Sequence, residues 1–409
     1  MDAIAFIGLS VLVFTGVIVL LVIVLMIAEK RMVKGGDVRI LINNDESKSP
    51  IVSAGSTLLS TLAGCSVFLP SACGGGGTCG QCKCQVTDGG GDVLATETGQ
   101  LTRAQQKDYY RLACQVKVKN DLKIKVPEEI FSIKKYACKV RSNNNVASFI
   151  KELVLELPKG EILDFKSGGY IQIDIPQYSL SYKEFDVAKQ YHDEWAKFGL
   201  WNLKAENDEP IFRAYSMASY PAENDIVMLN VRIASPPPRQ MHLPPGKASS
   251  YIFNLKPGDD VMISGPYGEF FINETDREML YIGGGAGMAP MRSHVMHLFK
   301  TQKTKRKVSF WYGARSLREI FYEDDFKRIT KEFPNFTYNI ALSEPLPEDN
   351  WKGLTGFIHA VILKEYLNNH PDPTEIEYYL CGPPLMIKAC KKMFYDLGVE
   401  DEMIRMDEF

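Results

Sequence analysis

The sequence predicts a multidomain protein with one N-terminal transmembrane helix, two β-rich domains and a C-terminal α/β domain. Three observations carry this prediction: an apolar N-terminal run, a glycine-rich loop with three cysteines, and a strand, glycine loop and helix in succession towards the C-terminus. At 409 residues the chain is too long for one ordinary domain, since domains average roughly 150 residues. A net charge of -3 without a basic stripe argues against a nucleic-acid partner.

The first segment, residues 3–28, is uncharged and mostly aliphatic. As a helix it is long enough to cross a hydrocarbon core of roughly 30 Å. A cleaved signal peptide is the alternative, but the run is too long and no basic segment precedes it. Lys30, Arg31 and Lys34 follow the run, so the positive-inside rule places the N-terminus outside and the later domains in the cytoplasm. We expect residues 1–32 to be a transmembrane helix and juxtamembrane segment in contact with lipid.

Four cysteines are candidate metal ligands: Cys73, Cys79, Cys82 and Cys114. The first three lie on a loop that is almost free of side chains. Their spacings suit a [2Fe-2S] cluster, and the intervening glycines let main-chain N–H groups approach its sulfides. A structural zinc site is the alternative, although such sites usually use two Cys-x2-Cys pairs or histidine. Four cysteines bound to iron, out of nine, favour a reducing cytosol over a disulfide framework.

The sequence around these cysteines resembles the ferredoxin family. Residues 69–73 (Leu-Pro-Ser-Ala-Cys) lead into the loop, and residues 111–115 (Arg-Leu-Ala-Cys-Gln) carry the fourth cysteine. The resemblance implies a β-grasp, α+β domain over residues 36–130, and strand patterns at 38–42 and 122–126 agree with it. One departure concerns the first two cysteines, which have five residues between them where plant-type ferredoxins have four, so the subfamily stays open.

Residues 131–275 are rich in predicted strands and contain Arg213, Tyr215 and Ser216 in an Arg-x-Tyr-Ser pattern. The pattern resembles the ferredoxin-NADP reductase superfamily, which implies an antiparallel β-barrel that binds FAD. By resemblance, the arginine binds the flavin pyrophosphate, the tyrosine lies against the ring, and the serine hydrogen-bonds its polar edge. Tyr215 and Ser216 are therefore candidate catalytic residues. An ordinary strand with a cross-strand aromatic is the alternative.

A second flavin signature of the same superfamily is matched by residues 246–253, where a glycine turn and small hydroxyl residues open a helix. A helix N-terminus offers free N–H groups and a positive dipole end to a diphosphate. Gly246, Ser249 and Ser250 are the implied pyrophosphate contacts, with plain helix capping as the alternative. An insertion at 178–210 is both aromatic and charged. It is interpreted either as a helical excursion with one buried face or as a docking surface.

In residues 276–409, strand, glycine loop and helix alternate, which is typical of a Rossmann-like α/β domain. A strand at 279–282 runs into a loop where glycines let the backbone approach a pyrophosphate at a helix N-terminus. The expected NADH contacts in this loop are Gly283, Gly284, Gly285, Gly287 and Met288.

The motif Cys381, Gly382 and Pro383 follows another predicted strand and resembles the nicotinamide-side motif of the same superfamily. The resemblance places the thiol near the nicotinamide as a catalytic candidate. It also implies that the final aromatic, Phe409, covers the flavin until nicotinamide displaces it, with a frayed terminus as the alternative.

The choice of nucleotide is indicated by residues 312–316 and the acidic residues 323–325 that follow. Acidic groups near the adenosine ribose favour NADH, whereas an arginine accommodates the 2′-phosphate of NADPH. Arg315 and Arg318 therefore leave NADPH as an open alternative.

The domain order also occurs in soluble reductase components of bacterial oxygenases, but a membrane helix and an aromatic insertion do not usually occur there. Together, the features resemble the F subunits of sodium-translocating NADH:quinone oxidoreductases along nearly the full chain. The resemblance implies an enzyme of the bacterial inner membrane that passes hydride from NADH to FAD and single electrons to the cluster. Other subunits then reduce ubiquinone and export sodium, so quinone is reached indirectly. A membrane-anchored NADH reductase of a multicomponent oxygenase is the alternative, and a slow redox sensor is a second one.

Overall fold

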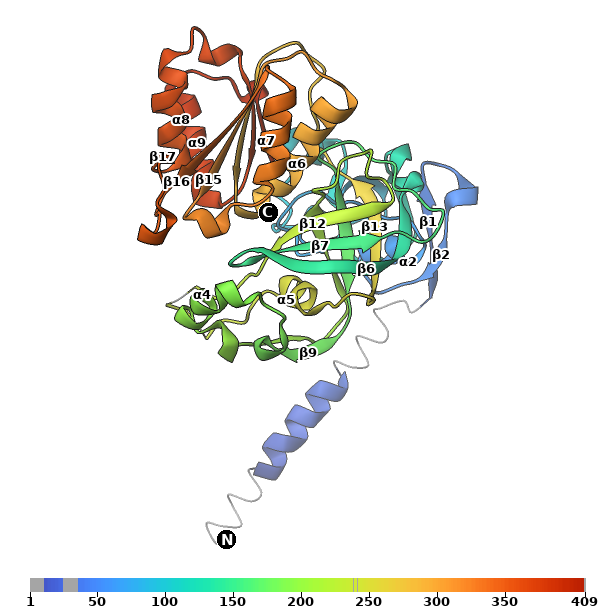
Figure 1. Cartoon of the computed structure of the whole chain (residues 1–409). Helices are drawn as coiled ribbons and strands as arrows, with labels where there is room; N and C mark the ends of the chain where they lie inside the picture. Colours follow the sequence, from blue (N-terminus) through green and yellow to red (C-terminus); the bar gives the residue numbers. More distant parts are fainter. Residues whose placement is uncertain (1–10, 25–35, 238, 241, 408–409) are drawn as a thin grey trace. The chain divides into compact units, whose positions relative to one another are not determined.

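The computed structural model of the chain describes residues 11–24, 36–237, 239–240 and 242–407 (Figure 1). Contacts divide the chain into two units, residues 1–132 and 133–409. Each unit has its own sheets.

The first unit contains a five-stranded mixed sheet in the order β2-β1-β5-β3-β4. Its strands are β1 (Asp37–Ile42), β2 (Ile51–Ser53), β3 (Lys83–Asp88), β4 (Tyr110–Leu112) and β5 (Leu122–Lys125). Strands β1 and β5 are parallel and the other neighbours are antiparallel. Helix α2 (Leu58–Gly64) is capped by Thr57 and buries its leucines, and α3 (Arg103–Lys107) precedes β4. This is the α+β arrangement that the sequence predicts.

A buried ion pair fixes the segment before the fourth cysteine. The carboxylate of Glu97 is fully buried and accepts a hydrogen bond of 2.7 Å from Nη2 of Arg111. The main-chain N–H groups of Leu94 and Leu112 also donate to it, each at 2.8 Å. Burial acts to raise the pKa of Glu97, but the hydrogen bonds from Arg111, Leu94 and Leu112 outweigh it and the pKa is lowered. Because every oxygen has a partner, the pair is a stable anchor for β4.

The second unit begins with a six-stranded antiparallel sheet in the order β11-β8-β13-β6-β7-β12. The strands are β6 (Lys134–Ala147), β7 (Ile150–Glu156), β8 (Tyr170–Ile175), β11 (Ile211–Ser216), β12 (Ile226–Arg232) and β13 (Asp260–Tyr267). Met217, just after β11, bridges Leu229 of β12, so the first and last strands meet and the sheet closes into the predicted barrel.

The insertion leaves and rejoins the barrel through a small hairpin of β9 (Tyr178–Ser181) and β10 (Lys204–Asn207). Between them lies α4 (His192–Lys197), whose Trp195 is completely buried in the barrel core. Its ring lies against those of Trp201 and Phe253, with centroids 5.0 and 6.0 Å away. The aromatic residues therefore pack inward, as expected for an excursion with one buried face.

The nucleotide domain is a parallel six-stranded sheet in the order β17-β16-β15-β14-β18-β19. The strands are β14 (Met279–Gly284), β15 (Val308–Ala314), β16 (Phe336–Leu342), β17 (Leu354–Thr355), β18 (Glu377–Cys381) and β19 (Ile404–Asp407). Helices α6 (Met288–Met296) and α7 (Glu323–Glu332) cover one face, and α8 (Ile358–Glu365) and α9 (Pro384–Asp396) cover the other (Figure 1). This confirms the Rossmann-like prediction, while β16, β17 and β19 were not predicted.

The predicted transmembrane segment is described only in part, because residues 1–10 and 25–35 lie outside the described residues. Residues 11–24 are helical and expose their aliphatic side chains. Within the described ranges, the structure contains no helix with both the length and the hydropathy that a membrane crossing requires.

A buried histidine sits on α6 against the barrel. The ring of His294 is fully buried, stacks on Phe270 and donates from Nε2 to the Phe270 carbonyl at 3.0 Å. Burial lowers its pKa to about 4, so the ring is neutral in the folded protein.

This neutral ring makes stability pH-dependent. In the unfolded chain the histidine takes up a proton near pH 6.5, whereas in the folded chain it does so only near pH 4. Its contribution is complete above pH 6.5 and is lost as the pH falls towards 4, by up to about 3 kcal/mol. We expect His294→Gln to weaken the acid dependence of urea unfolding. Tryptophan fluorescence is a suitable signal, because all four tryptophans lie in the second unit.

The matched control is His242→Gln, which changes an exposed loop histidine of the same unit. Equal loss of acid dependence in both variants would contradict the assignment to His294.

Candidate functional site

The predicted cluster ligands lie in two pairs. The Sγ atoms of Cys73 and Cys79 are 3.3 Å apart, and the thiols of Cys82 and Cys114 also share a hydrogen bond. The thiol of Cys79 holds the pKa of Cys73 at about 3, and the thiol of Cys82 holds that of Cys114 at about 7. Two sulfur pairs match the ligand set of a [2Fe-2S] cluster, in which each iron takes two thiolates.

N–H donors surround these sulfurs. The main-chain N–H groups of Thr78 and Gly77 donate to Cys73 and Cys114, respectively, and the amide Nε2 of Gln115 lies 3.5 Å from the Cys114 sulfur. Gly77 has a φ of 75°, and a Cβ there would lie 2.8 Å from Nε2 of Gln115. A larger residue would displace this donor, so the glycine loop fits a cluster whose sulfurs carry negative charge.

The two other cysteines of this unit lie outside the pairs. Cys84 is buried in β3, and burial raises the pKa of its thiol to about 12. Cys65 is the half-buried C-cap of α2. In the part of the chain that the structure describes, no three His, Cys, Asp or Glu side chains converge on a single metal-ion position.

The Arg-x-Tyr-Ser motif lies on β11. Arg213 and Tyr215 are two positions apart, so their side chains share one face of the strand, and Ser216 ends it. One guanidinium N–H of Arg213 donates to the Phe212 carbonyl at 2.7 Å. Burial raises the pKa of Tyr215, so its phenol stays protonated. A cation and a neutral aromatic ring side by side suit a flavin phosphate and ring.

The second flavin motif opens α5 (Lys247–Asn254) at Gly246, with no side-chain cap. Both serine hydroxyls have protein partners. Ser250 donates to the Gly246 carbonyl at 2.7 Å, and Ser249 accepts from the Ala234 N–H at 3.1 Å. A Cβ on Gly246 would lie 2.6 Å from that of Ala234. The group left to meet a phosphate is therefore the uncapped main chain of the first turn.

The glycine loop is pressed against the second nucleotide motif. In the parallel register, Gly283 of β14 pairs with Cys381 of β18. A Cβ on Gly287 would lie 2.2 Å from the carbonyl oxygen of Cys381, so no other residue fits there. At Gly382, whose φ is 154°, a Cβ would lie 2.9 Å from the Gly284 carbonyl oxygen. Helix α6 then begins at Met288 without a side-chain cap, which leaves its first-turn N–H groups for a pyrophosphate.

A carboxylate that sequence reasoning missed joins the nicotinamide-side motif to the flavin strand. Asp407 of β19 pairs with Cys381, and the hydroxyl of Ser216 donates to its Oδ2 at 2.5 Å. Burial raises the pKa of Asp407 and also that of the Cys381 thiol. The sequence around Asp407 does not mark it as a site residue, because only the pairing of β19 with β18 brings it beside Cys381. Phe409 lies outside the described residues.

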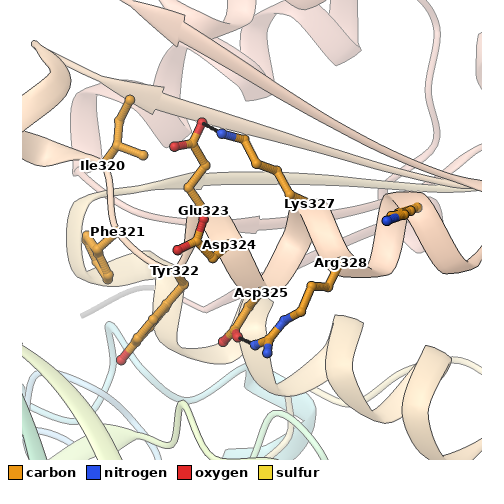
Figure 2. A pocket seen from close by; sticks show the side chains of 9 residues that line it. Ile320, Phe321, Tyr322, Glu323, Asp324, Asp325, Lys327 and Arg328 are labelled. Carbon is orange, nitrogen blue, oxygen red and sulfur yellow. Dashed lines mark hydrogen bonds and ion pairs between the residues drawn. The ribbon is translucent and has the colours of Figure 1, made fainter.

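A pocket of about 860 Å³ lies at the start of α7, and Figure 2 shows the side chains that line it. Its lining runs from Ile320 to Lys331 and includes the acidic residues 323–325. Glu323 pairs with Lys327 at 3.0 Å, and Asp325 pairs with Arg328. The lining contains no residue of the glycine loop, so this pocket is distinct from the predicted pyrophosphate site.

Three domain families match the chain. A 2Fe-2S iron-sulfur cluster binding domain matches residues 42–119, an oxidoreductase FAD-binding domain matches 196–272, and an oxidoreductase NAD-binding domain matches 281–392. These matches confirm the predicted [2Fe-2S], FAD and NADH-binding domains.

Two curated relatives decide the family. The chain is 54% identical over 401 residues to the F subunit of the Na(+)-translocating NADH-quinone reductase of Neisseria meningitidis serogroup B, and 98% of each chain is covered. It is 55% identical over 403 residues to the protein of the same name in Histophilus somni, with 98% and 99% covered. The chain belongs to this family. The F-subunit resemblance seen in the sequence is thereby confirmed.

Two solved structures share the fold of this chain. An Amycolatopsis cytochrome P450 reductase superposes with a TM-score of 0.62 at 22% identity, covering 91% of this chain and 98% of that one. The ferredoxin reductase in carbazole 1,9a-dioxygenase gives 0.60 at 23% identity, with the same coverage.

The paired cysteines predict separable cofactor sites. We expect Cys79→Ala to abolish the visible absorbance of the [2Fe-2S] cluster, because one iron loses a thiolate. FAD content should stay at the parent level, because the flavin motifs lie in the other unit. Both are measured by visible spectra and by extraction of FAD from purified protein.

Cys65→Ala is the control, since Cys65 belongs to the same unit but to neither pair. Retention of the cluster in Cys79→Ala, or its loss in Cys65→Ala, would contradict the ligand assignment.

Proposed function

We propose that this chain is the NADH-oxidising subunit of a membrane respiratory complex that reduces quinone and exports Na+. Near-full-length similarity to the F subunits of Na(+)-translocating NADH-quinone reductases is the observation that carries the proposal. In this proposal, residues 1–32 are the transmembrane helix and juxtamembrane segment and residues 36–130 the [2Fe-2S] ferredoxin-like domain. Residues 131–275 are the FAD-binding barrel and residues 276–409 the NADH-binding domain. FAD, when bound, accepts a hydride and releases electrons singly, which links NADH to an iron-sulfur cluster.

The glycine loop binds the pyrophosphate of NADH. Gly283, Gly284 and Gly285 bring the main chain close, and Gly287 and Met288 present the first N–H groups of α6. A Cβ on Gly287 would meet the Cys381 main chain, so the glycine loop and the nicotinamide-side motif are in direct contact and would hold the two ends of the same nucleotide.

The nicotinamide end is oriented by Cys381, Gly382 and Pro383, with Phe409 covering the flavin ring when nicotinamide is absent. The Cys381 thiol stays protonated because burial raises its pKa, so it contributes shape and no charge. The Ser216 hydroxyl donates a hydrogen bond to Asp407, so the serine oxygen can meet the flavin only as an acceptor.

The flavin is held by two elements. Arg213 and the first turn of α5, with Gly246, Ser249 and Ser250, bind the pyrophosphate, and Tyr215 lies along the ring.

The cluster that passes electrons to the partner subunits is held by Cys73, Cys79, Cys82 and Cys114.

The N-terminal helix anchors the chain in the bacterial inner membrane, with its N-terminus outside and its catalytic domains in the cytoplasm. The apolar run of 3–28, the basic residues after it and the exposed side chains of the helix at 11–24 support this proposal. Leu12 and Phe14, for example, are 71% and 69% exposed, as side chains that contact lipid would be.

Inverted membrane vesicles test the function. We expect NADH-driven ubiquinone reduction that is stimulated by sodium in the parent strain, absent after deletion of this chain and restored by its gene. If the activity survives deletion, the respiratory role is wrong and an oxygenase reductase becomes the better hypothesis.

Arginine substitutions within the apolar run test whether this segment anchors the chain in the membrane. Arginine near the middle of a spanning helix costs roughly 2.5–3.5 kcal/mol on insertion scales. We expect Val17→Arg/Leu20→Arg to move the chain from membranes into the supernatant of a carbonate wash. Val17→Leu/Leu20→Ile should remain with the membranes. Retention of the arginine variant would contradict a spanning helix.

A further inference from the structure

The end of β15 lies beside the pyrophosphate loop. Gly313 of β15 pairs with Gly284 of β14, and Arg315 follows immediately after the strand. In dinucleotide-binding folds this strand end faces the adenosine ribose, where a carboxylate meets a 2′-hydroxyl or an arginine meets a 2′-phosphate. Glu344, from the end of β16, donates its main-chain N–H to the Arg315 carbonyl at 2.8 Å. The charges around Arg315 therefore decide which nucleotide fits.

Arg315 is already held by carboxylates. Its Nη2 lies 3.2 Å from Glu319 Oε1 on the same turn and 3.7 Å from Glu194 Oε2, which belongs to the insertion. Its guanidinium also lies over the Phe149 ring, 5.8 Å from the centroid. Glu194 Oε1 pairs with Lys197 of the same helix at 3.2 Å, whereas Oε2 is buried, has no hydrogen-bond donor among the described residues and faces Arg315.

The second arginine is held by the neighbouring residue of the insertion. Arg318 Nη1 lies 2.6 Å from Asp193 Oδ2. The contact lowers the pKa of the Asp193 carboxyl and raises that of the Arg318 guanidinium. Adjacent residues of α4 thus occupy both arginines that a 2′-phosphate would use.

The position of α4 is fixed by its buried tryptophan. Trp195 Nε1 donates to the Ser148 carbonyl at 2.8 Å, in the turn between β6 and β7. The hydroxyl of Ser148 donates to Glu319 Oε1 at 2.6 Å. The barrel turn, the insertion and the strand end of the nucleotide domain therefore form one hydrogen-bonded cluster.

The charges in this cluster can be counted. The cations are Lys197, Arg232, Arg315 and Arg318, and the carboxylates are Asp193, Glu194, Glu319, Glu348 and Asp349. Four cations against five carboxylates leave one negative charge, which repels a phosphate. Without the two carboxylates of the insertion, the balance becomes one positive charge, and a phosphate can form charge-assisted hydrogen bonds with both guanidinium groups.

We propose that the insertion, through Asp193 and Glu194, makes the nucleotide site select NADH over NADPH by occupying Arg315 and Arg318. The inference rests on the proposed NADH site and assigns a role to the insertion within it. Selection comes from repulsion as much as from attraction, since a 2′-phosphate must either displace the carboxylates or remain beside them unpaired.

Binding to the full-length holoprotein tests the inference without turnover. The ligands are 5′-AMP and 2′,5′-ADP, which differ only by the 2′-phosphate, and calorimetry gives both Kd values. For Asp193→Asn/Glu194→Gln we expect 2′,5′-ADP to gain at least about tenfold in affinity relative to 5′-AMP. In the same variant, the ratio of kcat/KM for NADPH to kcat/KM for NADH should also rise. The gain should shrink at high salt, because the charges are partly exposed.

Glu209→Gln is the matched control, because it removes an exposed carboxylate from the same insertion. Asp193→Asn alone, at a side chain that is 60% exposed, should give a smaller shift in the same direction and preserves the test if the double variant does not fold.

An unchanged affinity ratio, or an equal loss for both ligands, would overturn the inference and leave the proposed function intact. Failure of the parent protein to bind 5′-AMP would overturn the nucleotide site and this inference together.

Discussion

The buried guanidinium of Arg292 joins the flavin barrel to the nucleotide domain. It lies on α6, the helix that begins at the glycine loop, and its side chain is 8% exposed. It donates to the Glu223 carboxylate at 2.9 and 3.1 Å and to the Ala218 carbonyl at 2.8 Å, both in the loop after β11, and to Asp325 of α7 at 3.2 Å. Removing one partner of such a buried pair costs roughly 3–5 kcal/mol, because a charge stays buried without compensation. The helix of the pyrophosphate loop and the strand of the flavin motif are thus held in one arrangement.

That arrangement explains how motifs far apart in the sequence meet. Ser216 ends the flavin strand and Asp407 ends the last strand of the nucleotide domain, yet their side-chain oxygens are 2.5 Å apart. Gly287 lies against the Cys381 main chain closely enough to exclude any side chain. Both contacts require the strand ends to be placed accurately. A hydride transfer site needs this accuracy, since misplacement of the reacting atoms by about 1 Å is costly for catalysis.

Sequence reasoning succeeded where residue type is dictated by local chemistry. A loop that carries Cys73, Cys79 and Cys82 between glycines, and a strand that runs into Gly283 and Gly284, each have few structural solutions, so the cluster loop and the Rossmann-like domain were predictable from the residues. The α+β and barrel folds were predicted from the resemblance to known families. Strand β19 was not, because four residues near the chain end carry little periodicity and become a strand only by pairing with β18. Asp407 was missed for the same reason.

The insertion shows why the sequence of a short amphipathic segment does not predict which of its faces is buried. Helix α4 has six residues, too few for a period to separate its faces. From the sequence, Trp195 was equally compatible with burial in the core and with contact to a partner protein. In the structure Trp195 completes the barrel core, while the preceding carboxylates, Asp193 and Glu194, reach the nucleotide domain. Because a ring buried in the barrel cannot also bind a partner, α4 acts outside the barrel core through its charged side chains. Those charges lie beside Arg315 and Arg318 of the nucleotide domain, which is why the insertion was proposed above to influence nucleotide selection.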